Sequence, residues 1–354
     1  MLELREVARR VGAQTHIHPT SLALRQGEFN VLLGTTLAGK TTLMQLMAGL
    51  VPPSAGAVWF GGRDVTRVPV QQRKVAMVFQ QFINYPNQTV FENIASPLRV
   101  ARTAEAEVRS RVGHIAELLQ LGPFLARRPA ELSGGQQQRT ALARALVKDA
   151  DLVLLDEPLA NLDYKLREGL REELPRLFAG RACTVVYATT EPSEALLLGG
   201  YTATVHEGRI TQYGPNGVVY REPADLVTAK VFSDPPINVA QVTKSGRRFH
   251  LSAQVSWPAE GRLGELPDGP YTVGLRPHNV LRAAGKDGGV PVDCRVLIAE
   301  ISGSESVVHF DLGGMAWVSQ SHGVHGFKVG AMARFELDVS RCLYFAPDGA
   351  RVGG

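Results

Sequence analysis

The chain has 354 residues, of which 44% are hydrophobic and 20% are charged, and its formal net charge is +4. This length predicts two domains, and the composition is that of an ordinary soluble globular protein. The mild positive charge, without a dense basic run, argues against a nucleic-acid-binding protein. No apolar run approaches the roughly 18 residues that a membrane-spanning helix needs, so we expect any link to a membrane to come through a partner.

Cysteine usage and the N-terminal segment bear on the compartment. The three cysteines, Cys183, Cys294 and Cys342, are widely spaced and odd in number. This pattern argues against a disulfide framework or a zinc site and favours a reducing cytosol. The opening MLELREVARR lacks the apolar core of a signal peptide. We therefore expect an intracellular protein.

Strand-like apolar runs alternate with helical patterns over residues 1–234, which is typical of α/β folds. Residues 29–33, FNVLL, predict a buried strand that is followed by a glycine and a helix. Residues 104–121 have apolar side chains at helical spacing, and the runs at 151–155 and 183–188 predict two further buried strands. Unbroken apolar strands suit a parallel sheet that is covered on both faces.

The pattern changes after SDPPIN, residues 233–238, whose two prolines indicate a linker. Beyond it, short strand-like segments are separated by glycines, and one hairpin is predicted to turn at Gly313-Gly314. Residues 333–339 alternate apolar and polar side chains, as a strand with one buried face does. We predict a second, mostly β and barrel-like domain over residues 235–354.

The segment GTTLAGKTT, residues 34–42, fits the phosphate-binding pattern G-x-x-x-x-G-K-[ST] between a predicted strand and a predicted helix. Its backbone amides and the helix N-terminus would cradle phosphates. Lys40 would reach the β- and γ-phosphates of ATP, and the Thr41 hydroxyl would bind Mg²⁺. We expect the nucleotide to contact the whole loop, which comprises Gly34, Thr35, Thr36, Leu37, Ala38, Gly39, Lys40, Thr41 and Thr42.

The segment DLVLLDEP, residues 151–158, supplies carboxylates at the end of a buried strand. Asp156 would hold Mg²⁺, and Glu157 would polarise the water that attacks the γ-phosphate. Paired acidic residues after an apolar run are a weak signal by themselves, because such pairs often cap helices. Together with the phosphate loop they predict an ATP-hydrolysing site.

The segment LSGGQQQR, residues 132–139, predicts a second phosphate-binding helix start. A serine hydroxyl and exposed glycine amides at a helix N-terminus suit an anion. One chain does not need two such elements on one γ-phosphate, so this one is expected to serve a nucleotide held by another subunit. The residues concerned are Ser133, Gly134, Gly135 and Gln136.

With these motifs the first 230 or so residues resemble the ABC transporter ATPases. The resemblance implies a P-loop nucleotide-binding domain over residues 1–234, with a helical subdomain at about 85–150, and a small OB-like regulatory or dimerisation domain over residues 235–354. It also implies that Gln80 of VFQQ senses Mg²⁺ and contacts a transmembrane partner. Asp163 of ANLD would face the opposite subunit. The segment GLRPHN, residues 274–279, is similar to one in the C-terminal domain of carbohydrate importer ATPases.

The family resemblance implies hydrolysis of ATP to ADP and phosphate on the cytoplasmic face of the bacterial inner membrane, where the chain would be peripheral. The implied partners are two transmembrane permease subunits, a second ATPase subunit and, indirectly, a periplasmic solute-binding protein. No nucleic acid is expected. A nucleic-acid-binding tail would need clustered aromatic and basic residues, and Trp257, Trp317 and scattered arginines are too few.

Three positions depart from the family pattern. Leu37 stands where the phosphate loop usually has a glycine, and because a bulky residue at positive φ is strained, we expect the loop to use other dihedral angles there. Val11 stands near the place of an aromatic residue that stacks on adenine. His16 or His18 could replace it, although a loop histidine without a role is commoner. Thr190 stands where the family usually has a histidine that contacts the γ-phosphate.

Segments such as LAGKT, QQFINYP and ATTEPSEALLLGG are similar to an ATPase subunit of the bacterial glycerol importer, which pairs two different ATPases. We therefore expect a glycerol importer and a second, non-identical ATPase subunit, with Thr190 in the weaker of two hydrolytic sites. The alternatives are an importer of glycerol 3-phosphate or of an oligosaccharide and, more remotely, a soluble ABC ATPase without a transport role.

Overall fold

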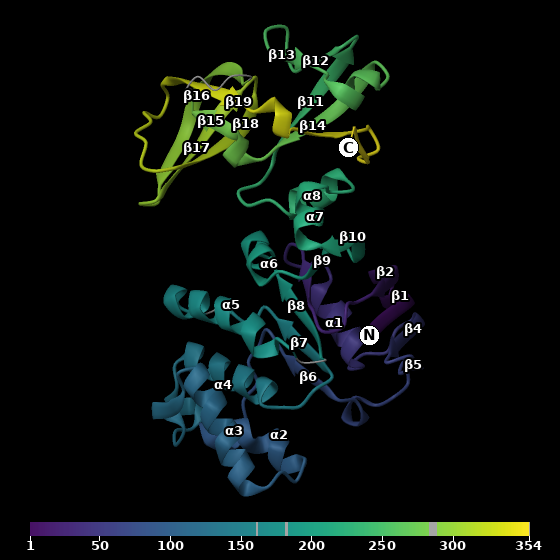
Figure 1. Ribbon diagram of the computed structural model, residues 1–354, viewed down its shortest axis with the longest axis vertical. Coiled ribbons are helices and arrows are strands. Elements are labelled where there is room, and N and C mark those ends of the chain that lie inside the picture. Colours follow the sequence, from purple (N-terminus) through teal and green to yellow (C-terminus); the bar gives the residue numbers. More distant parts are fainter. Residues whose placement is uncertain (161, 181–182, 283–288, 354) are drawn as a thin grey trace. The chain divides into compact units, whose positions relative to one another are not determined.

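The computed structural model describes residues 1–160, 162–180, 183–282 and 289–353. The chain divides into two compact units, Met1–Gly217 and Val218–Gly354, which are shown in Figure 1. Each unit has its own sheets and its own hydrophobic core. Among the described residues, none of the helices combines the length and the hydrophobicity that a bilayer span requires.

A six-stranded sheet forms the centre of the first unit, in the order β10-β9-β3-β8-β7-β6. Its strands are β3 (Phe29–Leu33), β6 (Val75–Val78), β7 (Leu152–Asp156), β8 (Thr184–Thr189), β9 (Tyr201–His206) and β10 (Arg209–Pro215). All neighbours pair in parallel except β9 and β10, which pair antiparallel. Every residue of β3, β7 and β8 is buried, as the unbroken apolar runs predict.

A second, antiparallel sheet has the order β2-β1-β4-β5. It is built from β1 (Leu2–Val11), β2 (Gln14–Ala23), β4 (Ala55–Phe60) and β5 (Arg63–Asp64). The helix α1 (Lys40–Ala48) contacts both β2 and the central strands β7 and β8. Its side chains Leu43, Met44 and Met47 are nearly inaccessible to solvent and share one core with both sheets. This packing fixes the start of α1, and therefore the loop that precedes it.

The helices α2 (Val90–Val100), α3 (Glu105–Leu118) and α4 (Gly134–Leu146) gather at one end of the first unit, away from β1, β2 and β4 (Figure 1). Helix α3 occupies most of the range that the apolar spacing predicts. Two further helices, α5 (Tyr164–Phe178) and α6 (Pro192–Leu198), precede and follow β8 and contact each other.

The second unit consists of two sheets around a shared core. The first sheet contains β11 (Asn238–Ser245), β12 (Arg248–His250), β13 (Ser256–Pro258), β14 (Gly269–Leu275), β20 (Leu343–Phe345) and β21 (Arg351–Val352). The second contains β15 (Val280–Arg282), β16 (Val290–Ile301), β17 (Glu305–Leu312), β18 (Met315–His322) and β19 (Met332–Leu337). The helices α7 (Asn216–Arg221) and α8 (Leu226–Val231) lead into this unit.

The structure of this unit can be compared with predictions from the sequence. The predicted hairpin joins β17 to β18 through Gly313-Gly314. The rings of Trp257 and Trp317 are both buried in the core, and the Trp257 indole donates to the Tyr344 hydroxyl at 2.7 Å. These tryptophans therefore stabilise the fold and offer no stacking platform at the surface. The predicted fold class, a P-loop α/β unit followed by a β-rich, nearly barrel-shaped one, is confirmed.

Candidate nucleotide site

The predicted site residues follow the carboxyl ends of four neighbouring parallel strands. The phosphate loop follows β3, Gln80 lies two residues after β6, Asp156 ends β7, and Thr190 follows β8. Ligands of open α/β sheets bind at this edge, because the strand ends and helix N-termini converge there. The sheet therefore brings together residues that are far apart in the sequence.

Close backbone contacts fix the phosphate loop. A side chain at Gly34 would place its Cβ only 2.3 Å from the Val205 carbonyl oxygen, and one at Gly39 would meet Ile17 at 2.9 Å. Gly39 also caps α1 with a φ of 108°, and neither a side-chain cap nor an acidic residue neutralises the first turn of the helix. The positive end of α1 is therefore available to a phosphate.

Leu37 corrects one prediction. The sequence argument expected the loop to avoid a positive φ at this bulky residue, but Leu37 has a φ of 67° and is 97% exposed. The left-handed conformation costs an L-residue about 1–2 kcal/mol. Because its side chain projects into solvent, this backbone strain is the only cost at Leu37, and the side chain does not clash with the rest of the fold. The loop thus keeps the backbone path that a glycine would allow.

Lys40 is buried and forms the centre of a polar cluster. Its ammonium group donates to the carbonyl oxygens of Gly34 at 2.8 Å and Thr35 at 3.0 Å, and lies 3.4 Å from a Glu157 carboxylate oxygen. Gln80 donates to the other Glu157 oxygen at 3.0 Å. Burial lowers the pKa of Lys40, and the Glu157 carboxylate opposes this change. Two residues of the same site therefore hold the predicted catalytic carboxylate.

Asp156 is 1% exposed, and neither of its carboxylate oxygens has a hydrogen-bond partner among the described residues. Burial raises the pKa of Asp156, while the neighbouring Thr41 hydroxyl and the Lys40 ammonium group lower it in part. A buried carboxylate without a partner, next to a hydroxyl and a phosphate loop, has the hard oxygen donors that Mg²⁺ prefers. The residues present therefore fit this cation.

The backbone around Glu157 connects the strand ends. Glu157 has a φ of 47°, and its N–H donates to the Ala188 carbonyl at 3.0 Å. The N–H of Gly34 donates to the Thr189 carbonyl at 3.3 Å. These bonds place the exposed Thr190 directly after a segment that is tied to both the phosphate loop and Glu157. A strained φ at a residue of this kind is typical of a functional site.

A pocket of about 680 Å³ lies over the phosphate loop. Its lining includes Lys40, Gln80 and Glu157, together with residues that sequence reasoning did not select: Gln14, Thr15, Glu207 and Gly208. His16 and His18 also line it, and the ring of His18 bonds to the Arg209 guanidinium group at 2.9 Å. Val11, which is 47% exposed, is not among the lining residues. No local motif marks the Glu207–Gly208 turn in the sequence, because only the fold brings it to the loop.

The second predicted phosphate-binding element starts α4. Ser133 caps this helix and accepts from the Gln136 N–H at 3.4 Å, while the Gln136 side chain accepts from the Ser133 N–H at 2.9 Å. Gly134 is exposed, and open space surrounds the position where a Cβ would lie. None of the residues from Ser133 to Gln136 lines the pocket over the phosphate loop. This chain therefore does not bring its two phosphate-binding elements to one pocket.

Asp163 caps α5 and accepts from the Leu166 N–H at 3.0 Å. It is exposed, as is Tyr164, the next residue. Asn161, which belongs to the ANLD segment, lies outside the described residues. Helix capping thus gives Asp163 a structural role, in addition to the interface role that the family resemblance implies.

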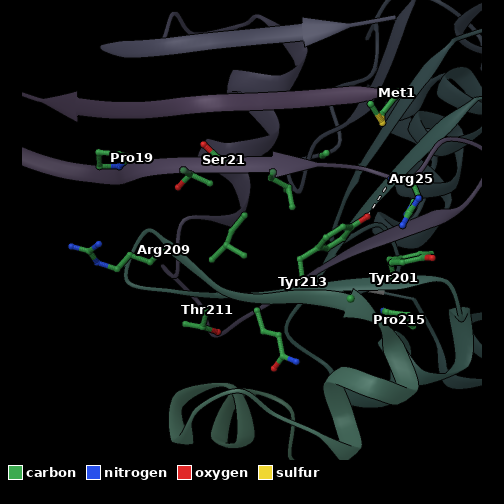
Figure 2. A pocket seen from close by; sticks show the side chains of 15 residues that line it. Met1, Pro19, Ser21, Arg25, Tyr201, Arg209, Thr211, Tyr213 and Pro215 are labelled. Carbon is green, nitrogen blue, oxygen red and sulfur yellow. Dashed lines mark hydrogen bonds between the residues drawn. The ribbon is translucent and has the colours of Figure 1, made fainter. Parts of the chain in front are cut away.

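A separate hollow of about 820 Å³ lies between the edge strands β2 and β10 (Figure 2). The Tyr213 hydroxyl donates to the Asn30 side chain at 2.6 Å and accepts from the Arg25 N–H at 3.1 Å. Burial raises the pKa of Tyr213 to about 12, so this hydroxyl stays protonated at neutral pH. The phosphate loop does not line this hollow, so its size does not make it the nucleotide site.

A parallel sheet, a phosphate loop at the end of its central strand and a carboxylate pair on the adjacent strand define a P-loop nucleotide hydrolase. Comparison with known proteins narrows this class. A family model described as ABC transporter matches residues 17–160.

Curated relatives match nearly the whole chain. The sn-glycerol-3-phosphate import ATP-binding protein UgpC of Cupriavidus necator is 34% identical over 99% of both chains. The trehalose/maltose import ATP-binding protein MalK of Thermococcus litoralis is 36% identical over 94% of both. A solved structure of the ATP-binding cassette MJ0796, described as a dimeric post-hydrolysis state bound to ADP and Pi, is 28% identical with a TM-score of 0.56. It covers 61% of this chain and 99% of its own. The chain belongs to the ABC transporter family and is an ATP-binding ATPase.

Proposed function

We propose that the chain is the ATP-binding subunit of an ABC importer and that it couples ATP hydrolysis to the uptake of a small polyol, its phosphate or a sugar. The observation that carries this proposal is the match of both units, over 99% of the chain, to a relative named as an import ATP-binding protein. A match limited to the nucleotide-binding unit would fit any ABC ATPase. The proposed location is the cytoplasmic face of the bacterial inner membrane, where the chain would be held by its partners.

Each site residue has a proposed role in this reaction. Lys40 binds the β- and γ-phosphates, and Asp156 and Thr41 would hold Mg²⁺, which when bound neutralises charge on the transferred phosphoryl group. Glu157 orients the attacking water and accepts its proton. Gln80 and Lys40 contact Glu157 at 3.0 and 3.4 Å. Before Glu157 can hydrogen-bond to the attacking water, we expect the Lys40 ammonium group to leave Glu157 and to bind phosphate instead.

Glycerol is the solute that we propose first, because several segments resemble those of a glycerol importer ATPase subunit. The names of the curated relatives favour glycerol 3-phosphate or a disaccharide as alternatives. The solute would bind to the permeases and a periplasmic protein, so the choice needs an uptake measurement. Uptake of labelled glycerol, glycerol 3-phosphate and maltose is measured after deletion of the gene, and one of the three should no longer be taken up. The wild-type gene should restore this uptake, and a gene that carries Lys40→Met should not. Unchanged uptake of all three would contradict the proposed substrate class.

The permease subunits are proposed to dock on the segment that follows Gln80. Ile83 is 60% exposed and Tyr85 is 48% exposed, although hydrogen bonds hold the surrounding backbone. The side chain of Asn93 bonds to both the N–H and the carbonyl of Tyr85, and the Arg144 guanidinium lies 4.8 Å from the Tyr85 ring. Apolar side chains presented on a fixed backbone are typical of a protein interface.

Cysteine crosslinking tests this docking. Tyr85→Cys should crosslink to permease loops in the assembled transporter. Val100→Cys provides the matched control, because Val100 is 86% exposed at the end of α2 and lies outside the proposed surface. Crosslinks from position 100 but not from position 85 would place the interface elsewhere.

A second, non-identical ATPase is the proposed partner in the nucleotide-bound state. Thr190 lacks the imidazole ring that the family usually has at this position, whereas the residues from Ser133 to Gln136 are intact and exposed or half-exposed. A partner that keeps the histidine would form a fast site with this chain's α4, and Thr190 would lie in a slow one. The alternative is a dimer of two copies of this chain, for which the solved dimeric relative is the precedent.

Paired substitutions in the reconstituted transporter distinguish the two arrangements. Gly135→Asp should nearly abolish ATP turnover, because it blocks the element that completes the partner's site. Glu157→Gln should cost much less than the equivalent substitution in the partner chain. Equal losses from the two glutamate substitutions would contradict the asymmetric pair, and full activity of this chain as the sole ATPase would establish the homodimer.

A further inference from the structure

A buried ion-pair network lies behind the turn that carries Thr190. Arg171 of α5 is 8% exposed, and Glu194 of α6 is 4% exposed. The Arg171 guanidinium donates to one Glu194 oxygen at 3.3 and 3.1 Å and also to the Glu191 carboxylate. None of these three residues lines the pocket over the phosphate loop, so they have no direct part in nucleotide binding.

The network holds both neighbours of Thr190. The second Glu194 oxygen accepts from the Tyr187 hydroxyl at 3.0 Å and from the Thr189 hydroxyl at 2.6 Å. The Thr189 hydroxyl in turn accepts from the Glu191 N–H at 3.0 Å. The residues before and after Thr190 are therefore fixed to helices α5 and α6, while Thr190 itself is exposed.

The same helix α5 also reaches the segment that follows Glu157. Arg167, one turn before Arg171, donates to Glu191 at 3.1 Å and to the carbonyl oxygens of Ala160 and Leu162 at 3.2 and 3.3 Å. The N–H of Ala160 donates to the Glu157 carbonyl at 3.4 Å. Two arginines of α5 thus connect the chain after Glu157 to the turn at Thr190.

The net stability of such a network is small. Removing two charges from water costs several kcal/mol per ion, and apolar side chains of similar volume often stabilise a protein equally well. What a charged and hydrogen-bonded arrangement supplies is directional contact, because each oxygen accepts from defined donors. A geometric role therefore explains this network better than a stabilising one does.

We propose that Arg171 is a positioning residue for ATP hydrolysis. It fixes the turn from Thr189 to Glu191 and, with Arg167, transmits movement of Ala160 and Leu162 to Thr190. Contact of the neighbouring Asp163 with a second ATPase subunit would then set the position of the Thr190 hydroxyl. The inference rests on the proposed role of Thr190 at the hydrolytic site and on the proposed contact of Asp163 with the other subunit.

The test compares Arg171→Met with Arg176→Met in a transporter whose partner ATPase carries glutamine in place of its own catalytic glutamate, so that kcat reports turnover at this chain's site. Arg176 lies on the same helix, but its side chain is 68% exposed and pairs with Glu173 at 2.8 Å, which makes it a matched control. Arg171→Met should lower kcat for ATP hydrolysis about 10- to 100-fold, as displaced catalytic groups do. KM for ATP should stay near the wild-type value, because the phosphate loop is untouched. An unchanged kcat, or a rise in KM of the same size as the fall in kcat, would overturn the proposal.

A second variant separates positioning from stability. Arg171→Met leaves Glu194 buried without its cation and can impair folding, whereas Arg171→Met with Glu194→Gln removes both charges. The double variant should unfold near the wild-type temperature and still have a low kcat. Recovery of kcat together with stability would reduce the network to a structural role. ATP hydrolysis by the wild-type chain in the same assay tests the proposed function independently. If the wild-type chain hydrolysed no ATP, the proposed function would be contradicted, and not the role of Arg171.

Discussion

Replacement of Leu37 by glycine should stabilise the first unit. Leu37 has a φ of 67° with its side chain 97% exposed, so the substitution relieves backbone strain without removing buried apolar surface. The relief is about 1–2 kcal/mol. The greater freedom of glycine in the unfolded chain offsets about 0.5–1 kcal/mol of it. The expected net gain is therefore on the order of 0.5–1 kcal/mol, or roughly 1–4 °C in Tm for a unit of this size.

Thermal unfolding of the full-length chain measures this gain. Because two units can unfold separately, the transition of the first unit is identified by its shift on addition of ATP. Leu37→Ala is the matched control, since alanine removes the same exposed side chain but keeps the Cβ and hence the strain. A Leu37→Gly chain that unfolds no higher than Leu37→Ala would refute the strain argument. ATP affinity should be unaffected, because the loop already follows the path that glycine allows.

Four further predictions concern the site and the domain boundary. Asp156→Asn should raise the Tm of the nucleotide-free protein at pH 7. Burial raises the pKa of the Asp156 carboxyl, and the stability of the wild-type protein therefore falls as the pH rises through that pKa. The gain in Tm should vanish when the pH is lowered to the ordinary pKa of aspartate, about 3.9. Lys40→Met should weaken equilibrium binding of labelled ATP at least about 100-fold, because it removes the cation facing the phosphates. Thr190→His should raise kcat at this chain's own site at least about tenfold, since one added donor to the transition state often contributes more; phosphate release is measured with the partner's catalytic glutamate replaced by glutamine. A chain that ends at Gly217 should unfold cooperatively and bind less of a hydrophobic dye than one that ends at Val239.

The last of these predictions follows from packing around the linker. Ala229 and Ile237 belong to the second unit and share a buried cluster with Leu343 and Phe345 of the same unit. The N–H of Leu226 also donates to the Gly349 carbonyl at 2.9 Å. A truncation after residue 239 would therefore keep the first part of the second unit and expose apolar side chains that normally pack against the rest of it.

The central strands could be predicted from the sequence, because a strand buried on both faces needs an uninterrupted apolar run. The run at residues 151–155 marks a strand that the structure places at Leu152–Asp156. The offset has a physical reason: a carboxylate normally ends an apolar strand, whereas Asp156 remains paired with Ala188 in the ladder and is buried. The phosphate loop was also predictable, because its spacing and its strand–helix context are specific.

Other features depend on tertiary contacts that leave no local pattern. Arg171 and Glu194 are separated by 22 residues, and each lies in a segment whose charges would suit a solvated helix face. Only the packing of α5 against α6 buries them together. The same reasoning applies to the 3.4 Å contact between Lys40, which starts α1, and Glu157, which follows β7.

The nucleotide site accumulates local costs that the surrounding fold must offset. Leu37 and Glu157 both have positive φ angles, Lys40 is 4% exposed, and the Asp156 carboxylate has no hydrogen-bond partner among the described residues. The packing of α1 between two sheets fixes the start of this helix and with it Lys40, while β7 carries Asp156. Phosphate oxygens would replace the Glu157 carboxylate as the negatively charged partner of Lys40. A divalent cation would provide a partner for the Asp156 carboxylate. On the proposed function, ATP with Mg²⁺ would supply the partners that these two side chains need, and its binding would release Glu157 from Lys40.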